Sequence, residues 1–152
     1  MRLSDQEITS QAAIEAIIEE AKFCRLGLVD GDQPYVVPLL FGYQDKTLYF
    51  HCALEGRKID IIKKNPKVCF EVDVSTKLIG AEEACSWDLK YKSVIGFGKA
   101  YLVEDLDEKK KGFRILMAHY SSKTYHIPDK DIEESGIIRM DIEEMTGKHS
   151  ET

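Results

Sequence analysis

The sequence is poor in cysteine and has no long apolar run. Its four cysteines, Cys24, Cys52, Cys69 and Cys85, include no Cys-x-x-Cys pair, so we expect reduced thiols in the core rather than a disulfide framework. The first residues, MRLSDQEITSQAAIEAIIEEAK, are charged throughout and lack the apolar region of a secretory signal. No apolar run approaches the ~20 residues that span a bilayer. These absences predict a cytoplasmic protein without membrane association.

Net positive charge is also lacking. The 152 residues carry 21 Lys and Arg against 27 Asp and Glu, a formal charge of −6. A broad nucleic-acid or anionic-membrane face needs cations that neutralise phosphates, so neither partner is expected and any functional positive charge must be local. With 43% hydrophobic and 32% charged residues, and neither repeat nor linker, residues 1–152 are expected to form one globular domain.

Hydrophobic periodicity predicts a mainly β chain with helices at the connections. The expected strands cover 23–29, 35–42, 47–52, 68–74, 91–103 and 137–142. The expected helices cover 10–22, within an N-terminal helical segment 1–22, then 56–65 and 106–120. The stretch 75–90 is expected to be irregular, and a C-terminal tail over 144–152 is expected to fray. Short strands in meander order are typical of a closed or split β-barrel.

The most informative segment is His51-Cys-Ala-Leu-Glu-Gly-Arg-Lys58, where a strand ends and a helix begins with Arg57 and Lys58. A helix N-terminus already carries about half a positive charge, so cations in its first turn are unfavourable unless an anion is present. A phosphate monoester would satisfy the free N–H groups, the arginine fork and the lysine charge, and Gly56 would permit its close approach. The alternative is a solvated basic turn beside Glu55.

A proline lies inside the predicted strand Tyr35-Val-Val-Pro-Leu-Leu-Phe41. Proline removes a donor from the ladder, so Pro38 is expected at a sheet edge or an opening. Main-chain groups freed in this way can bind the ring atoms of a flavin. An ordinary edge strand is the alternative.

The predicted strand 91–103 carries glycines at alternate positions, Gly96 and Gly98, which share one face. Together they would leave a surface that a ring or another backbone can approach, and a bulge or barrel corner is the alternative. Trp87 is the only tryptophan. It is expected to stack on a ligand or anchor a dimer interface, with core filling as the alternative.

These segments resemble a known family. PYVVPLLFGY, LYFHCALEGRKIDIIKKNPKVCFEVD, KYKSVIGFGKA and the EEMTGK ending are similar to the pyridoxamine 5'-phosphate oxidase-like split barrels, in the branch that includes nitroimidazole-resistance proteins. The similarity extends from about Leu26 to Lys148, and HxAxxGRK is its most specific part. It implies an FMN-binding split β-barrel with flanking helices that works as a homodimer, with the cofactor sites between the subunits.

The resemblance also implies roles for individual residues. Gly56, Arg57 and Lys58 match the family's phosphate-binding turn. The other matched residues line the cofactor: Val36, Val37, Pro38 and Leu39 on the strand facing the isoalloxazine ring, Phe50 and His51 beside the ribityl chain, Ser93 and Val94 on the neighbouring strand, and Trp87 closing the pocket. The chain lacks the arginine that opens this strand in true pyridoxamine-phosphate oxidases, and their C-terminal substrate-binding segment, so pyridoxal-phosphate synthesis is not expected.

Other chemistry has little support. His51 and Cys52 are neighbours on a predicted strand and point to opposite faces, so no metal site is expected. His119 and His126 flank a polar loop and are expected to be solvated. No nucleophile and base stand at a recognisable spacing, so hydrolysis is not expected.

We therefore expect an FMN-dependent oxidoreductase that reduces small electron-poor substrates such as nitroaromatics. His51 is the candidate proton donor near the ring, because imidazoles exchange protons near neutral pH. A structural histidine is the alternative for this residue. For the whole chain, a non-catalytic flavin- or haem-binding storage protein and a deazaflavin-dependent reductase of the same fold also remain open.

Overall fold

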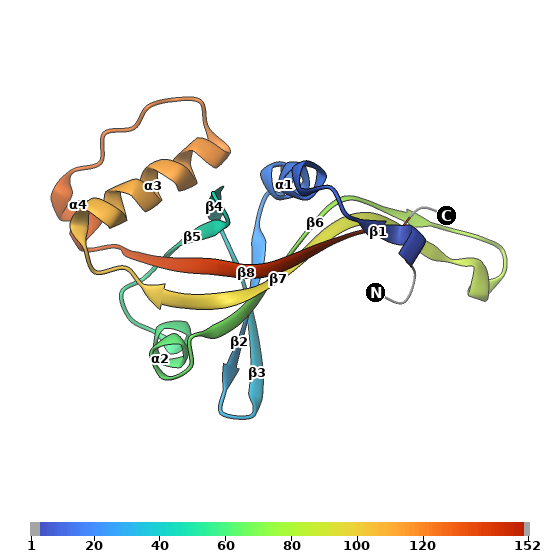
Figure 1. Ribbon diagram of the computed structural model, residues 1–152, viewed down its shortest axis with the longest axis horizontal. Coiled ribbons are helices and arrows are strands. Elements are labelled where there is room, and N and C mark those ends of the chain that lie inside the picture. Colours follow the sequence, from blue (N-terminus) through green and yellow to red (C-terminus); the bar gives the residue numbers. More distant parts are fainter. Residues whose placement is uncertain (1–3, 151–152) are drawn as a thin grey trace.

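The computed structural model describes residues 4–150, in which one antiparallel sheet curls into an open barrel (Figure 1). The strands are β1 Glu7–Ile8, β2 Cys24–Asp30, β3 Gln33–Leu39, β4 Phe41–Gln44, β5 Thr47–Cys52, β6 Lys67–Ile79, β7 Asp88–Leu102 and β8 Gly136–Ser150. The helices are α1 Gln11–Glu20, α2 Arg57–Lys64, α3 Leu106–Tyr120 and α4 Asp129–Glu133. The strand order is β3-β2-β6-β7-β8-β5-β4, with β1 paired to β8. This arrangement confirms the expected mainly β split barrel with flanking helices.

The barrel is split between β3 and β4. These strands lie at opposite ends of the strand order, although only Leu40 separates them in the chain. The expected single strand 35–42, and the continuous meander through it, are therefore wrong: the chain leaves the sheet just after Pro38, which has no N–H to extend a ladder. Among the described residues β3 pairs with β2 alone, so its other edge is free. The expectation that Pro38 lies at a sheet edge or opening is confirmed.

The main core fills the barrel interior. Inward-pointing residues alternate with outward-pointing ones along β2, β6 and β7, and Leu26, Phe70 and Val94 are almost completely buried. The Ser10 side chain caps α1 by accepting a hydrogen bond from the Ala13 N–H. One apolar face of α1 and one of α2 close the interior, through Ile14, Ile17 and Ile18 and through Ile59, Ile61 and Ile62.

A second, smaller core lies beneath α3 on the outer face of β5 and β8. Tyr49 and Ile137 point outward from these strands and pack with Phe113 of α3 and Ile132 of α4. The short helix α4 was not expected. Buried Lys109 stabilises its end by donating hydrogen bonds to the carbonyl oxygens of Glu133 and Ser135. These bonds hold the C-terminal end of α4 to α3.

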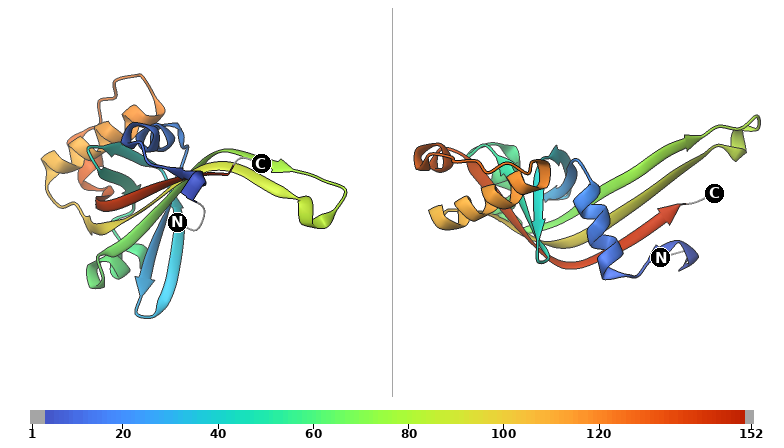
Figure 2. Two further views of the ribbon diagram at one scale, coloured as in Figure 1. Left: turned by 45° about the vertical axis from the view of Figure 1, so that its right-hand side comes forward. Right: turned by 90° about the horizontal axis from the view of Figure 1, so that it is seen from above.

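The strands β6 and β7 continue beyond the barrel as a two-stranded arm, residues 75–92, which Figures 1 and 2 show projecting from the body. The expectation of an irregular stretch over 75–90 is wrong for residues 75–79 and 88–90, which belong to β6 and β7: Lys77 pairs with Lys90 and Ile79 with Asp88. The register shifts between Val74 and Lys77. No residue from 75 to 92 is buried, so the arm lacks the alternation that marks a buried strand.

The C-terminal segment is also ordered, contrary to the expected fraying tail over 144–152. The strand β8 runs to Ser150, which lies opposite Tyr91 of β7, and Gly147 lies opposite Ile8 of β1. Neighbours on both sides complete its ladders, and these partners are distant in the sequence. The ends of the N-terminal segment and of the tail, residues 1–3 and 151–152, lie outside the described residues.

The alternating glycines of β7 face the interior. A Cβ on Gly96 would overlap the Phe70 ring, and one on Gly98 would overlap the carbonyl oxygen of Asp141. The register between β7 and β8 shifts between Phe97 and Gly98. A bulge with a close backbone approach, the alternative at these positions, accounts for Gly98, whereas Gly96 makes room for the Phe70 ring of the same chain.

The cysteines and the helices bear on two further expectations. Cys24 and Cys52 are buried thiols, as expected, whereas Cys69 is partly exposed and Cys85 is exposed. Cys85 lies in the arm, and Cys69 lies on the outer face of β6, where its sulfur packs against Gly27 of β2. None of the helices among residues 4–150 is long and apolar enough to cross a membrane.

Candidate cofactor site

The N-terminus of α2 forms the cationic turn. Gly56 precedes the helix with φ 130° and ψ 172°, a conformation that residues with side chains rarely adopt. No side chain caps the helix, so its first N–H groups have no partner within the helix and are available to an anion. The position of a Cβ on Gly56 has no heavy atom within 4 Å. This open cradle, with Arg57 and Lys58 in its first turn, fits a phosphate group.

Arg57 joins this turn to the β2–β3 hairpin. Its guanidinium carbon lies 4.5 Å from the centre of the Tyr35 ring, and its Nη2 lies 3.8 Å from a carboxylate oxygen of Asp30. The side chains of this ion pair are 55% and 41% exposed, so the pair is weak and leaves the guanidinium accessible to a ligand. The sequence indicated neither Tyr35 nor Asp30 as a site residue, because only the fold brings them to Arg57.

The free edge of β3 begins beside the same turn, since Tyr35 is a residue of this strand. Val37 and Leu39 pack against the barrel core. Val36 and Pro38 point to the outer face, where Val36 is 63% exposed. A ring bound in the split could therefore reach the main-chain groups of the predicted residues Val36–Leu39, rather than their side chains.

The end of β5 supplies Phe50 and His51 with opposite orientations. Phe50 is completely buried in the main core, so its side chain does not reach the surface. His51 is exposed, and its ring lies 5.5 Å from the ring of Phe113 on α3. Pairing of β5 with β4 ends at Phe50 opposite Phe41, so the main chain at His51 borders the split. Phe113 is a contact that spacing along the sequence could not reveal.

The remaining predicted residues lie in the second half of the β6–β7 hairpin. Trp87 is 52% exposed near the tip of the arm, where its ring packs near Gly80. Ser93 lies at the base of the arm, opposite Asp73 and Lys148, and Val94 is completely buried. The structure therefore brings Arg57 of the α2 turn to the start of β3, whereas His51 lies against Phe113 of α3. It does not place Trp87, Ser93 or Val94 beside the turn in the same chain.

Two neighbouring groups bear on the chemistry of the site. Burial raises the pKa of the Cys52 thiol, although the nearby charge of Lys58 opposes this shift, so Cys52 is not a thiolate nucleophile at neutral pH. His119 is not solvated as expected: its ring lies 4.4 Å from that of Phe41, and its Nε2–H donates a 2.6 Å hydrogen bond to the carbonyl oxygen of Ala21. His119 thereby anchors α3 beside the start of β4.

Comparison with known proteins identifies the family of this chain. The sequence pattern of the family described as pyridoxamine 5'-phosphate oxidase matches residues 10–149. The chain belongs to this family. A candidate 5-nitroimidazole antibiotic resistance protein from Bacteroides thetaiotaomicron is 33% identical, with a TM-score of 0.84, over 94% of this chain and 86% of that one.

Two further relatives of this member of the pyridoxamine 5'-phosphate oxidase family are more distant. A flavocytochrome from Azotobacter vinelandii is 20% identical, with a TM-score of 0.86, over 100% of this chain and 72% of that one. At this identity the likeness shows the shared fold. An uncharacterized protein from Rhizobium meliloti is 29% identical over 65 residues, which are 43% of this chain and 42% of that protein. The matched part thus spans less than half of that curated relative.

Proposed function

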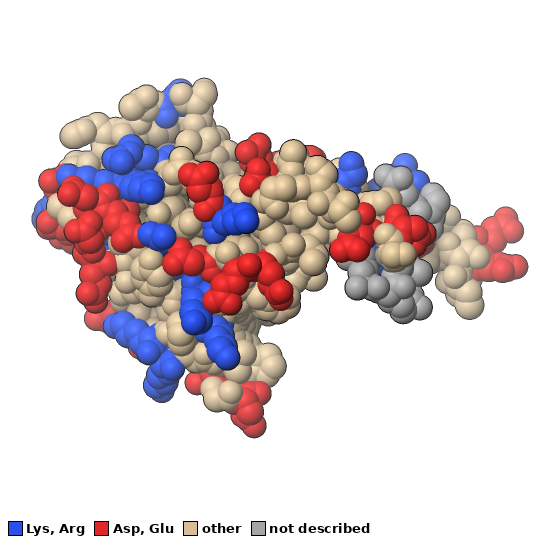
Figure 3. All heavy atoms as spheres, in the orientation of Figure 1, with Lys and Arg blue, Asp and Glu red and all other residues tan. Residues whose placement is uncertain are grey.

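We propose that the chain binds FMN between the α2 turn and the free edge of β3. The observation that carries this proposal is the uncapped N-terminus of α2, where Gly56 leaves open space and two cations stand in the first turn. The positive end of a helix dipole and two cations in its first turn repel each other unless an anion is bound. Arg57 and Lys58 would hold the phosphate, and the β3 main chain would hold the ring. Figure 3 shows Lys and Arg side chains around α2 on a body of mixed charge.

We infer further that the bound flavin serves a reductase of small electron-poor substrates such as nitroaromatics. The similarity of 33% over 94% of the chain to a candidate nitroimidazole resistance protein supports this substrate class. When bound, a flavin supplies the redox chemistry, and the protein supplies orientation and protons. His51, exposed at the split, is the side chain placed to donate a proton from its imidazole to the reduced substrate.

The site is proposed to be completed by a second copy of the chain. Trp87 and Ser93 lie in the arm and at its base, away from the α2 turn of their own chain. The outer face of the sheet also carries apolar side chains in one area: Val36 on β3 and Ile95 and Phe97 on β7 are 63%, 44% and 50% exposed. A homodimer would bury this face and bring the arm of the partner to the split.

The test of FMN binding compares two double variants of α2. Arg57→Gln with Lys58→Gln removes both cations at the N-terminus, whereas Lys63→Gln with Lys64→Gln removes two cations at the C-terminus of the same helix. Bonds to charged groups contribute about 1.5–3 kcal/mol each, so the first variant should weaken FMN binding ~100-fold or more in fluorescence titrations. The second should bind like wild type. Equal affinities in both variants would refute the phosphate assignment.

Turnover per bound flavin tests the reductase and His51 together. The reduced protein, prepared with dithionite or NAD(P)H, is mixed with a nitroaromatic compound and its reoxidation is followed by absorbance. We expect His51→Ala to retain FMN and to slow reoxidation about 10²–10⁴-fold. Normal turnover in the variant would make His51 structural. No reoxidation in wild type would favour a flavin- or haem-binding storage protein.

A further inference from the structure

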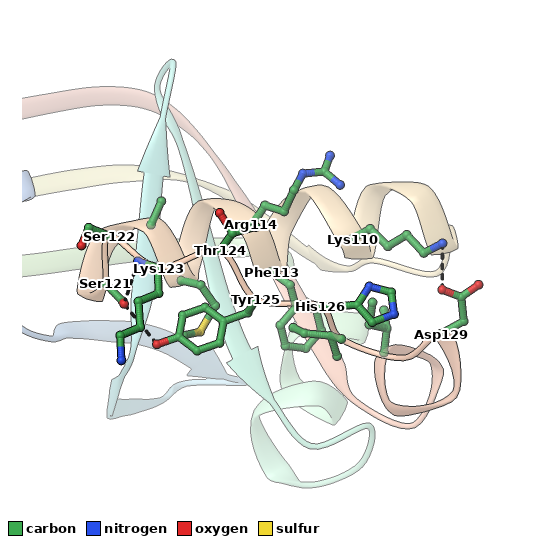
Figure 4. Close-up of a pocket in the computed structure, with 14 residues that line it drawn as sticks. Lys110, Phe113, Arg114, Ser121, Ser122, Lys123, Thr124, Tyr125, His126 and Asp129 are labelled. Carbon is green, nitrogen blue, oxygen red and sulfur yellow. Dashed lines mark hydrogen bonds and ion pairs between the residues drawn. The ribbon is translucent and has the colours of Figure 1, made fainter.

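A cavity of the described chain lies away from the α2 turn. It has a volume of about 590 Å³, which is within the usual range for small-molecule sites. It lies between α3, the segment 121–128 and the first residues of α4 (Figure 4). The segment 121–128 has no helix or strand. It is tied to itself through Ser121, whose Oγ lies 3.1 Å from the Tyr125 hydroxyl and accepts a hydrogen bond from the Lys123 N–H.

The lining combines an apolar floor with a cationic rim. Phe113 and Met117 of α3 and Ile127 and Ile132 of the opposite wall form the floor. Tyr125 lies across the open side, and its ring is 48% exposed (Figure 4). Aromatic faces on a floor and a wall suit a planar ring system, because offset or edge-on stacking adds to the burial of apolar area.

The rim carries more positive than negative charge, although the chain as a whole is acidic. The lining contains one acid, Asp129, and four basic residues, Lys110, Arg114, Lys123 and His126. The Asp129 carboxylate already forms an ion pair with the Lys110 ammonium at 2.9 Å. Among residues 4–150, no ion pair involves Arg114 or Lys123. Arg114 also lies one helical turn after Lys110, and like charges at this spacing repel. Asp129 already offsets this repulsion at Lys110, so an added anion would pair with Arg114.

The chemistry of the rim distinguishes between anions. A guanidinium matches a carboxylate with two parallel hydrogen bonds. The cavity begins at the second turn of α3, and the helix that begins at its other end, α4, opens with the acidic Asp129. A polyphosphate would be repelled at that end, so a single carboxylate beside Arg114 is favoured.

We propose that this cavity is a second binding site, separate from the α2 turn, for a planar aromatic carboxylate. The ring system lies between Phe113 and Tyr125, and the carboxylate is attracted by the positive charge of the rim, to which Arg114 and Lys123 contribute from different sides of the cavity (Figure 4). Phe113 also contacts His51, so an occupant of the cavity touches the residue that packs against the candidate proton donor.

The test titrates the protein, as purified and again saturated with FMN, with 2-naphthoate by calorimetry. A ligand of this size should bind with a dissociation constant on the order of 0.1–1 mM. Arg114→Gln with Lys123→Gln should weaken binding at least ~10-fold, as should replacing the carboxylate by the neutral 2-naphthamide. The Lys63→Gln with Lys64→Gln variant, matched in charge, should bind like wild type. The imidazole proton resonances of His126 and His51 should shift on titration.

Each other outcome overturns the proposal. Absence of saturable binding, or equal affinity for the acid and the amide, would show that the cationic rim recognises nothing. Loss of 2-naphthoate binding in the Arg57→Gln with Lys58→Gln variant, or its displacement by FMN, would place the carboxylate at the α2 turn. Because the titration is read without any redox step, a failed FMN assignment does not alter its result.

Discussion

The two ends of the β6–β7 hairpin differ in how far their side chains are buried, although they belong to the same pair of strands. In the barrel half, β6 alternates buried and outward residues from Lys67 to Val74, and β7 does so from Val94 to Ala100. In the arm half no side chain is buried, and Leu78, Trp87 and Leu89 are 64%, 52% and 41% exposed. The barrel half is ordered by side-chain burial, the arm half by backbone pairing alone.

This difference shows where the molecule is incomplete. An isolated two-stranded hairpin is marginally stable in water at best, and this one keeps large apolar side chains where water would reach them. The interior of the barrel half is complete within the chain, because α1 and α2 cover it. The arm half has the composition of a surface that another molecule covers, which agrees with the proposed homodimer.

The largest predicted effect contrasts one glycine from each half. Gly98→Ala would drive a methyl group into the Asp141 carbonyl of the neighbouring strand, and we expect a loss of about 3 kcal/mol or more in the free energy of unfolding. Gly80→Ala in the arm would meet the Trp87 ring at 3.5 Å, an ordinary contact, and should change stability by less than ~1 kcal/mol. Urea denaturation measures both. Equal losses would mean that the arm is packed as tightly as the barrel.

The same contrast explains how far the sequence predicted the fold. Helices α1, α2 and α3 and the inner parts of the strands were predictable because one face of each is buried, which imposes a period of 3.6 or 2 on the apolar residues. The arm and the end of β8 carry no such period. Gly147 and Lys148 are held by ladders to β7 and β1, and such long-range pairing leaves no local signal.

The candidate site was predictable to a similar degree. The α2 turn was found because Gly56, Arg57 and Lys58 break a local rule of helix electrostatics. The residues that surround it, Tyr35 and Asp30, and the Phe113 ring beside His51, were not found, because nothing in their own neighbourhood is unusual. The cavity under segment 121–128 was missed for the same reason: its cations come from α3 and a loop that only the fold brings together.

A smaller effect is expected from removing the aromatic anchor of the arm. Trp87→Ser should leave the unfolding free energy of the chain within ~0.5 kcal/mol of wild type, because the ring has few contacts in its own chain. Buried tryptophans at interfaces commonly contribute 2 kcal/mol or more, so dimer dissociation should become about 30-fold easier. Tyr125→Ser, which removes a similarly exposed ring from the body, is the control and should not alter association. Sedimentation equilibrium distinguishes the two. An unchanged dimer in the Trp87 variant would remove the arm from the interface.

The smallest predicted effect concerns Asp73, at the boundary between the two halves. Its carboxylate accepts a 2.6 Å hydrogen bond from Arg25 of β2 and a 2.8 Å hydrogen bond from Thr76, the residue at the register shift. Burial alone would raise the pKa of Asp73, but the hydrogen bonds from Thr76 and Arg25 outweigh burial and the net pKa is lowered. Asp73→Asn should cost about 1 kcal/mol, at the low end for charge-assisted bonds because Arg25 is 41% exposed.

The pH dependence of that cost identifies its origin. A carboxyl group whose pKa is lowered by folding stabilises the folded state above its unfolded pKa of about 3.9, and this contribution is lost as the pH falls through the lowered folded value. The stability difference between wild type and Asp73→Asn should therefore be constant near neutral pH and shrink below about pH 4. Burial raises the pKa of the neighbouring Glu71, although Arg25 opposes the shift, and the Asp73 carboxylate raises it further. Asp73→Asn therefore also removes the part of the Glu71 shift that Asp73 causes. A difference that stays constant down to pH 2 would show that Asp73 acts through its shape rather than its charge, and that the arm is attached to the barrel by the ladder alone.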